Sequence, residues 1–267
     1  MPVLQLLALN ALISAGLFIA LWRYSLLIKD PSFIDSWWAL GMVVIAITSY
    51  LLTGGQDPHR IALTAICTVW GLRLGLYLLW RWRKDGPDRR YDTMMGKAKT
   101  DRGWSYAKAS LLLVFALQMP LQFAVSLPVQ LGQVNAAGPL GPIAWVGVGL
   151  AVIGIYFETV GDWQLVQFKK NPENKGKILD TGLWAYTRHP NYFGDACVWW
   201  GLALIAAETG LIGALGIAGA VLITFLLTKW SGVPTTEGRM RRKRPDYEAY
   251  VARTSGFIPM PPKRPKA

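Results

Sequence analysis

Apolar runs of about 20 residues recur along this chain, and a helix of that length crosses the roughly 30 Å hydrocarbon core of a bilayer. The seven runs are residues 3–22, 33–53, 61–82, 108–128, 142–163, 192–208 and 210–229. Only 16% of the residues are charged, 52% are hydrophobic, and the mean hydropathy is +0.29. These features predict an all-α polytopic membrane protein of about seven transmembrane helices, the last two forming a tight hairpin.

The basic residues are distributed unevenly between the segments that link these runs. Of the 28 Lys and Arg residues, nine lie in 81–108, five in 164–191 and ten from Lys229 onward; with Arg23 and Lys29, 26 fall on one side. Cytosolic segments carry such an excess, so we expect a cytosolic C-terminus and an external N-terminus. We expect a bacterial inner-membrane protein with membrane lipids, rather than nucleic acid, as its surroundings. The same charges would also suit a cytosolic anionic ligand.

Domain organisation is simple at the level of sequence. No internal repeat or soluble domain is visible, so one membrane domain over 1–267 is predicted, with a C-terminal module at about 108–260. Cys67 and Cys197 both fall inside apolar runs, without a Cys-x-x-Cys pair. We therefore expect buried core cysteines and no disulfide or metal site.

Five charged residues interrupt the apolar runs at a similar depth. The predicted topology puts all of them in the cytosolic half of the membrane: Asp35, Arg73, Glu158, Asp162 and Asp195. Charges at such depth are costly, and those that remain are candidates for function. The alternative is mutual neutralisation, for example of Arg73 by Asp195 or Glu158. Convergence from four runs favours a pocket facing the cytosol.

Small and kinking residues predict how two runs pack. Gly71 and Gly75 have the spacing of a close helix–helix contact. Pro120 should kink the fourth run. The neighbouring Gln118 and Gln122 either line a cavity or pair with other helices, and the sequence leaves both options open.

The stretch "TRHPNYFGD", residues 187–195, gathers polar groups at the start of the sixth run. Asn191 is a candidate helix cap, and Arg188 and His189 would add positive charge to the free N–H groups there. Because the preceding loop "FKKNPENKGK" is also basic, a phosphate site is favoured over a bare cap.

The segment "RKDGPDRRYD" before residue 93 has two interpretations. Asp88, Arg90 and Tyr91 could simply lie on a solvated face. Alternatively, arginine could grip a phosphate while the tyrosine stacks on a flat ring. Spacing does not choose between them.

The long motif "FETVGDWQLVQFKKNPENKGKILDTGLWAYTRHPNYFGDACVWWG" resembles the membrane-embedded steroid 5-alpha-reductase-like family, in its DUF1295 branch. The resemblance extends to "SFIDSWWALG", "WGLRLGLYLLWR", "DRRYDTM", "SGVPTTEGR" and "RPDYEAYVARTSGFIP". It implies a seven-helix enzyme that binds NADPH in the cytosolic half. The implied reaction is reduction of a carbon–carbon double bond conjugated to a carbonyl.

By motif position, the resemblance implies cofactor contacts at Arg73, Asp162, Lys169, Asn191, Tyr192 and Asp195. Further cofactor contacts are expected at Asp88, Arg90, Glu158, Arg188, His189 and Tyr250. The acid that polarises the substrate carbonyl is expected to be Asp35, with Tyr91 as the second candidate. A hydrophobic substrate, steroid- or isoprenoid-like, is expected to enter from the bilayer.

Two positions depart from the steroid enzymes. Their Gln-Glu pair precedes a Pro-Ser-Phe, where this chain has Ile28 and Lys29 in "IKDPSFID". Their motif has Glu where this chain has Asp195. Steroid specificity therefore does not follow from the resemblance.

The isoprenylcysteine carboxyl and phospholipid methyltransferases are the alternative. They resemble "YTRHPNYFG" and follow it with a helical hairpin and an acidic residue. Glu237 would have that role here, with S-adenosylmethionine as the cofactor.

Overall fold

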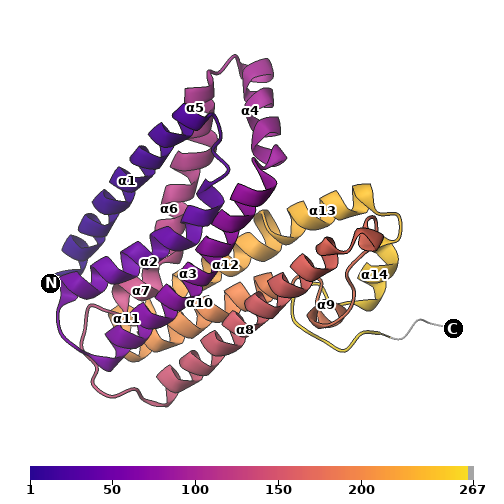
Figure 1. Cartoon of the computed structure of the whole chain (residues 1–267). Coiled ribbons are helices and arrows are strands. Elements are labelled where there is room, and N and C mark those ends of the chain that lie inside the picture. Colours follow the sequence, from indigo (N-terminus) through magenta and orange to yellow (C-terminus); the bar gives the residue numbers. More distant parts are fainter. Residues whose placement is uncertain (264–267) are drawn as a thin grey trace.

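The computed structural model describes residues 1–263 and consists of helices joined by short connections (Figure 1). The predicted all-α fold is confirmed. The last four residues of the predicted domain, 264–267, lie outside the described residues. The helices and their bounds are α1 Val3–Ile28, α2 Ile34–Thr53, α3 Pro58–Asp85, α4 Arg89–Arg102, α5 Tyr106–Ser110, η1 Leu111–Phe115, α6 Ala116–Val125, α7 Leu127–Leu131, α8 Pro142–Lys170, η2 Pro172–Asn174, α9 Leu183–Tyr186, α10 Pro190–Glu208, α11 Leu211–Ala214, α12 Ile217–Phe225, η3 Leu226–Trp230, α13 Val233–Lys243 and α14 Tyr247–Arg253.

Within the described residues, six helical stretches are long and apolar enough to cross a membrane: α1, α2, α3, α5 to α6, α8 and α11 to α13. The sixth predicted run, 192–208, forms α10, which does not meet this measure. Its sequence includes Asn191, Asp195 and Glu208, and most of its residues are buried against other helices. A helix so covered by protein needs little apolar surface of its own. The chain is an integral membrane protein.

The predicted contact at Gly71 and Gly75 is confirmed. These two glycines let α3 lie directly against α2: a Cβ on Gly71 would meet Val43 Cγ2 at 2.4 Å, and one on Gly75 would meet Leu40 Cγ at 2.5 Å. Small residues at this spacing permit such close approach of two helix backbones.

The closest helix pair is α8 with α10. A Cβ added to Gly154 would come within 2.5 Å of the Gly194 carbonyl oxygen, and one on Gly201 within 2.4 Å of the Gly147 carbonyl oxygen. The predicted hairpin after α10 is also present, because α10 ends at Glu208 and α11 begins at Leu211. Gly210 lies in that turn with φ 109°, a conformation that favours glycine.

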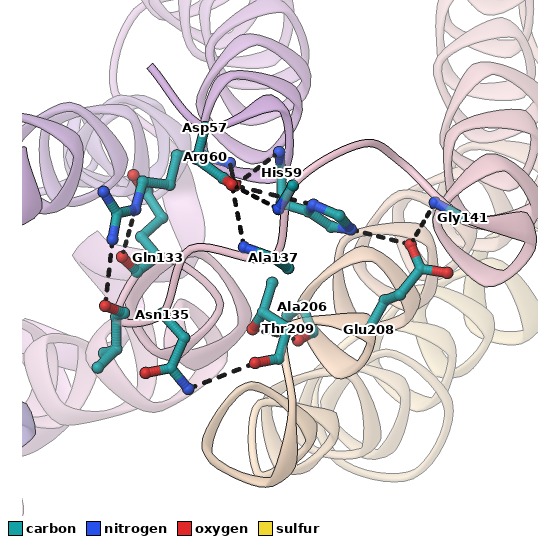
Figure 2. Close-up of polar contacts among 12 residues, drawn as sticks. Asp57, His59, Arg60, Gln133, Asn135, Ala137, Gly141, Ala206, Glu208 and Thr209 are labelled. Atoms are coloured by element: carbon teal, nitrogen blue, oxygen red, sulfur yellow. Dashed lines mark hydrogen bonds and ion pairs between the residues drawn. The ribbon is translucent and has the colours of Figure 1, made fainter. Parts of the chain in front are cut away.

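A polar cluster at the N-terminal end of α3 joins several connections (Figure 2). The His59 Nε2 atom lies 2.8 Å from Glu208 Oε2, and the Gly141 N–H donates to the same carboxylate at 2.9 Å. The Arg60 Nε–H donates to the Gln133 carbonyl oxygen at 2.8 Å. These contacts fasten α3, α10 and the loop before α8 at the end opposite the cavities described below.

The span from α5 to α6 is not a regular α-helix. It changes to a π-helix at η1, and Pro120 follows within α6. The Gln122 amide donates to the carbonyl oxygens of Trp37 and Trp38, 2.9 Å each, so this glutamine pairs with α2. Gln118 combines the two predicted options, because it lines a cavity and its amide donates to the Tyr91 hydroxyl of α4.

Candidate functional site

The polar stretch 187–195 surrounds the start of α10. Pro190 is its first residue and His189 precedes it, so Asn191 is not the cap that the sequence predicts. Proline is favoured at a first helical position, where its missing N–H is no loss, and this moves the helix start ahead of Asn191. The Asn191 side chain instead donates to Asp162 Oδ1 at 3.4 Å, across to α8.

A cavity of about 430 Å³ opens beside this helix start, and we call it the acidic cavity. Nine of the predicted site residues line it: Asp35, Arg73, Arg90, Tyr91, Glu158, Asp162, Asn191, Tyr192 and Asp195. The structure therefore brings the five charged residues that were predicted to share a depth to one cavity. The rest of its wall is largely apolar and comes from α2, α3, α6, α12 and η3.

Arg73 is the cation that pairs with the acids of α8 in the acidic cavity, which Arg81 and Arg90 also line. Its guanidinium forms ion pairs with Glu158 and, at 2.7 Å, with Asp162 Oδ2. The Trp70 indole N–H donates to Glu158 Oε1 at 2.9 Å. The pairing with Glu158 is one that the sequence left open, whereas Asp195 forms no ion pair within residues 1–263.

Asp195 has a different environment from the other two acids. Asp195 is only 9% exposed, and its Oδ1 atom is buried without a hydrogen-bond partner among the described residues. Because a buried acceptor without a donor is costly, this atom is suited to receive an N–H or O–H from a ligand.

Tyr91 and Asp35 form a hydrogen-bonded pair on the same cavity. The Tyr91 hydroxyl donates to Asp35 Oδ1 at 2.5 Å and accepts from the Gln118 amide at 3.2 Å. Burial raises the pKa of Tyr91 well above its usual value, and the negative charge of Asp35 adds to the effect. Tyr91 is therefore a neutral hydroxyl donor across the physiological pH range.

Arg90 and Asp88 support this pair from outside. The Arg90 guanidinium reaches Asp35 Oδ2 at 3.0 Å and Asp88 Oδ2 at 2.9 Å. Asp88 caps α4 by accepting from the Arg90 N–H at 2.9 Å, and it does not line the acidic cavity. Burial alone would raise the pKa of Asp88, but its hydrogen bonds with Arg90 outweigh burial and lower the pKa. The structure gives Asp88 a capping position.

A second cavity, of about 480 Å³, lies among α8, the following loop, α13 and α14, and we call it the basic cavity. No Asp or Glu is among the described residues that line it. Six cationic residues do: Lys169, Lys175, Lys177, Arg188, Arg239 and Arg244. Four of the predicted site residues are here, namely Lys169, Arg188, His189 and Tyr250.

Arg188 is largely used by the protein itself. Its Nε–H donates to Glu237 Oε1 at 2.8 Å, and its Nη1 donates to the Thr254 carbonyl oxygen at 2.5 Å. His189 Nε2 lies 3.3 Å from the same Glu237 oxygen. The Tyr250 hydroxyl donates to the Trp184 carbonyl oxygen at 2.5 Å, and burial raises its pKa. These groups fix α13 and α14 against the start of α10.

The two cavities adjoin along α8. Glu158 and Asp162 line the acidic cavity, while Leu165 and Lys169 line the basic one. Spacings of four, three and four residues put all of them on one helix face. At the start of α10, likewise, Arg188 and His189 face the basic cavity and Asn191 and Tyr192 the acidic one.

Several lining residues were not predicted from sequence. Lys175 and Lys177 belong to the basic loop, whose overall charge predicts an anion site without singling out these two lysines. Arg239 and Arg244 lie some 60 residues later along the chain, and their positions carried no signal. Residues on α13 reach the basic cavity only because Arg188 and Glu237 dock that helix.

The family model described as "Protein of unknown function (DUF1295)" matches residues 21–254 of the chain. The chain belongs to the DUF1295 family. This DUF1295 protein is also 38% identical over 77 residues to a probable O-methyltransferase, ustE, from Ustilaginoidea virens, a match covering 29% of the chain and 26% of that relative. The chain thus spans about a quarter of the relative's length. No solved structure matches it.

Proposed function

We propose that this protein is an NADPH-dependent membrane reductase acting on a carbon–carbon double bond conjugated to a carbonyl. The observation that carries the proposal is the shared face of α8, which joins a basic cavity to an acidic one that contains a neutral hydroxyl donor. An extended cofactor, charged at one end and reactive at the other, fits such a pair of cavities.

Charge favours a dinucleotide. NADPH is a polyanion through its pyrophosphate and 2′-phosphate groups, and the basic cavity offers six cationic side chains. S-adenosylmethionine carries a net positive charge and has a single carboxylate to pair with them, so these cations favour it far less. The unpartnered Asp195 Oδ1 suits the carboxamide N–H₂ of a nicotinamide. The residues present therefore fit NADPH.

When bound, NADPH would supply a hydride to the β-carbon of the substrate, and a proton from water would add to the α-carbon to complete the reduction. The negative charge that develops on the substrate carbonyl oxygen needs a hydrogen-bond donor, and Tyr91 is neutral, buried and at the cavity wall. Rotation about its C–O bond would turn the hydroxyl from Asp35 to that oxygen. Asp35 and Gln118 would hold the ring in place, so Tyr91 is the proposed donor and Asp35 its positioning residue.

The substrate is proposed to be hydrophobic and to enter from the bilayer. Leu117 of α6 and Trp230 of η3 line the acidic cavity, yet they are 45% and 55% exposed. The mouth of the cavity therefore lies between these two elements, in spans that face lipid. From the distribution of basic residues, we propose that both cavities face the cytosol, in the inner membrane of a bacterium.

Ligand-induced thermal stabilisation of the detergent-purified protein tests the proposal. NADPH at about 100 times its dissociation constant should add roughly 2.7 kcal/mol of stability, and S-adenosylmethionine should add none. Asp195→Ala and Arg239→Gln should each raise the Kd for NADPH about tenfold. Arg242→Gln is the matched control, because Arg242 is exposed on the same helix and does not line the cavity.

Turnover completes the test. With NADPH bound, hydrophobic enones should be reduced at the α,β double bond. Absence of NADPH binding, or binding unaffected by both cavity variants, would contradict the proposal.

A methyltransferase is the second candidate, favoured by the partial match to the probable O-methyltransferase. Glu237, held between Arg188 and His189, is the acid that the methyltransferase alternative requires. In that case S-adenosylmethionine alone would stabilise the protein, and Glu237→Gln would abolish the effect.

A further inference from the structure

A groove of about 400 Å³ lies between α4 and η1, and the proposed reductase makes no use of it. Seven lining residues repeat at intervals of one helical turn and form a stripe along α4: Arg90, Thr93, Met94, Lys97, Ala98, Asp101 and Arg102. The facing wall is Leu113 of η1, in a candidate membrane span. The groove therefore combines a charged wall with an aliphatic one.

Two of the three cations in the groove are not engaged by acidic partners. Arg90 is already paired with Asp35 and Asp88. Lys97 and Arg102 are exposed, and neither forms an ion pair within residues 1–263. Asp101 is the single acid on the wall, so the free part of the groove attracts an anion.

Trp104 indicates where this groove lies relative to a membrane. The Arg102 guanidinium and the Lys108 ammonium each lie 4.9 Å from its ring centre. Tryptophan flanked by cations is typical of the interface between lipid headgroups and water. Just beyond, Leu112 is 45% exposed on the span that carries Leu113.

We infer that this groove binds an anionic phospholipid of the surrounding bilayer. The lipid phosphate lies between Lys97 and Arg102, and an acyl chain runs over Leu112 and Leu113. A zwitterionic lipid lacks the net charge that these cations select, and a soluble phosphate ester lacks the chain. The inference does not depend on the proposed reaction.

The test compares lipids with identical acyl chains on the detergent-purified protein. Phosphatidylglycerol should raise the melting temperature more than phosphatidylcholine does, and the difference should shrink as salt is added. Glycerol 3-phosphate at the same concentration should have no effect. An equal response to the two lipids, or a full response to glycerol 3-phosphate, overturns the inference.

Two double variants with the same loss of charge locate the site. Lys97→Gln/Arg102→Gln should raise the half-maximal phosphatidylglycerol concentration roughly tenfold or more. Arg89→Gln/Lys99→Gln changes two exposed cations of α4 outside the groove and should respond as the unmodified protein does. Lipid-free melting temperatures report folding of both. Equal losses in the two double variants would assign the effect to general charge and refute a site in the groove.

Discussion

At the scale of single residues, the acidic cavity holds more carboxylates than cations. Arg73 pairs with Glu158 and Asp162, while Asp195 keeps an unpartnered oxygen. The sequence reveals these residues because a charge inside an apolar run is conspicuous. It does not reveal their partners, since each pair joins helices far apart in the chain and depends on how those helices rotate against one another.

Replacement of Tyr91 by Phe tests the proposed donor. Tyr91→Phe should reduce turnover of an enone by about 10²- to 10⁴-fold while leaving the Kd for NADPH within about twofold, because the hydroxyl acts on the substrate. Since the pKa of Tyr91 is raised well above its usual value of about 10, the unmodified enzyme should not lose this donor up to pH 9. Equal turnover by the Phe variant would remove Tyr91 from the mechanism.

Asp57, at the other end of the molecule, provides a pH-dependent prediction. It caps α3 and accepts N–H donors from Ala137 and Gly138 at 3.0 Å each. Burial alone would raise its pKa, but these backbone hydrogen bonds dominate and lower it. A lowered folded pKa means that the stabilisation is present above the unfolded pKa of about 4 and is lost as pH falls through the folded value.

Asp57→Asn should therefore lower the stability at pH 7 by about 1–3 kcal/mol, because an amide N–H₂ in place of Oδ2 cannot accept from the Ala137 and Gly138 N–H groups. The measurement is the melting temperature of the two proteins across pH. The difference between the two proteins should narrow at acidic pH, since Asn does not titrate. A stability difference between the two proteins that stays constant down to pH 3 would contradict this role of the Asp57 carboxylate.

At the scale of elements, glycines decide how the helices pack. The sequence predicts the contact of Gly71 and Gly75 correctly because their spacing lies within one run. It gives no comparable indication for α8 and α10, where Gly154 and Gly194 meet across 40 residues of chain. A spacing rule applies to one helix at a time, whereas this contact depends on glycines of both α8 and α10.

Two glycines of α8 make a matched pair for testing this contact. Gly154→Ala should destabilise the protein by about 1–3 kcal/mol, because the added Cβ meets the Gly194 carbonyl oxygen at 2.5 Å. At Gly149 nothing lies within 4 Å of an added Cβ. Gly149→Ala should be neutral or stabilising by up to about 1 kcal/mol. Similar melting temperatures for both variants would contradict the packing argument.

At the scale of the whole molecule, α13 and α14 pack back against the start of α10, and this packing closes the C-terminal part of the fold. Arg188 connects that start to Glu237 of α13, to the Val251 carbonyl oxygen within α14 and to the Thr254 carbonyl oxygen just after it. The depth of the polar residues predicts one cavity, and the structure has two that adjoin. The sequence predicts an anion site at the second cavity through Arg188, His189 and the basic loop. It does not predict the wall formed by α13 and α14, because these helices reach the loop after α8 only in the folded chain.

Removal of the Arg188 side chain should loosen this closure. Arg188→Ala leaves the buried Glu237 carboxylate short of its main cation, which should cost about 3–5 kcal/mol. Limited proteolysis should then cleave near α13 and α14 before the rest of the chain. Arg242→Ala, an exposed change on α13, should leave the cleavage pattern unchanged, and a resistant Arg188 variant would argue against this role.

The burial of α10 has a consequence for how the protein is made. A segment that carries Asn191, Asp195 and Glu208 is a poor substrate for one-by-one insertion into lipid during synthesis. Once α8 is in the membrane, its glycine-lined face offers α10 a surface to pack against. Biogenesis should therefore follow an order in which α8 precedes α10 and α10 enters the membrane as its partner.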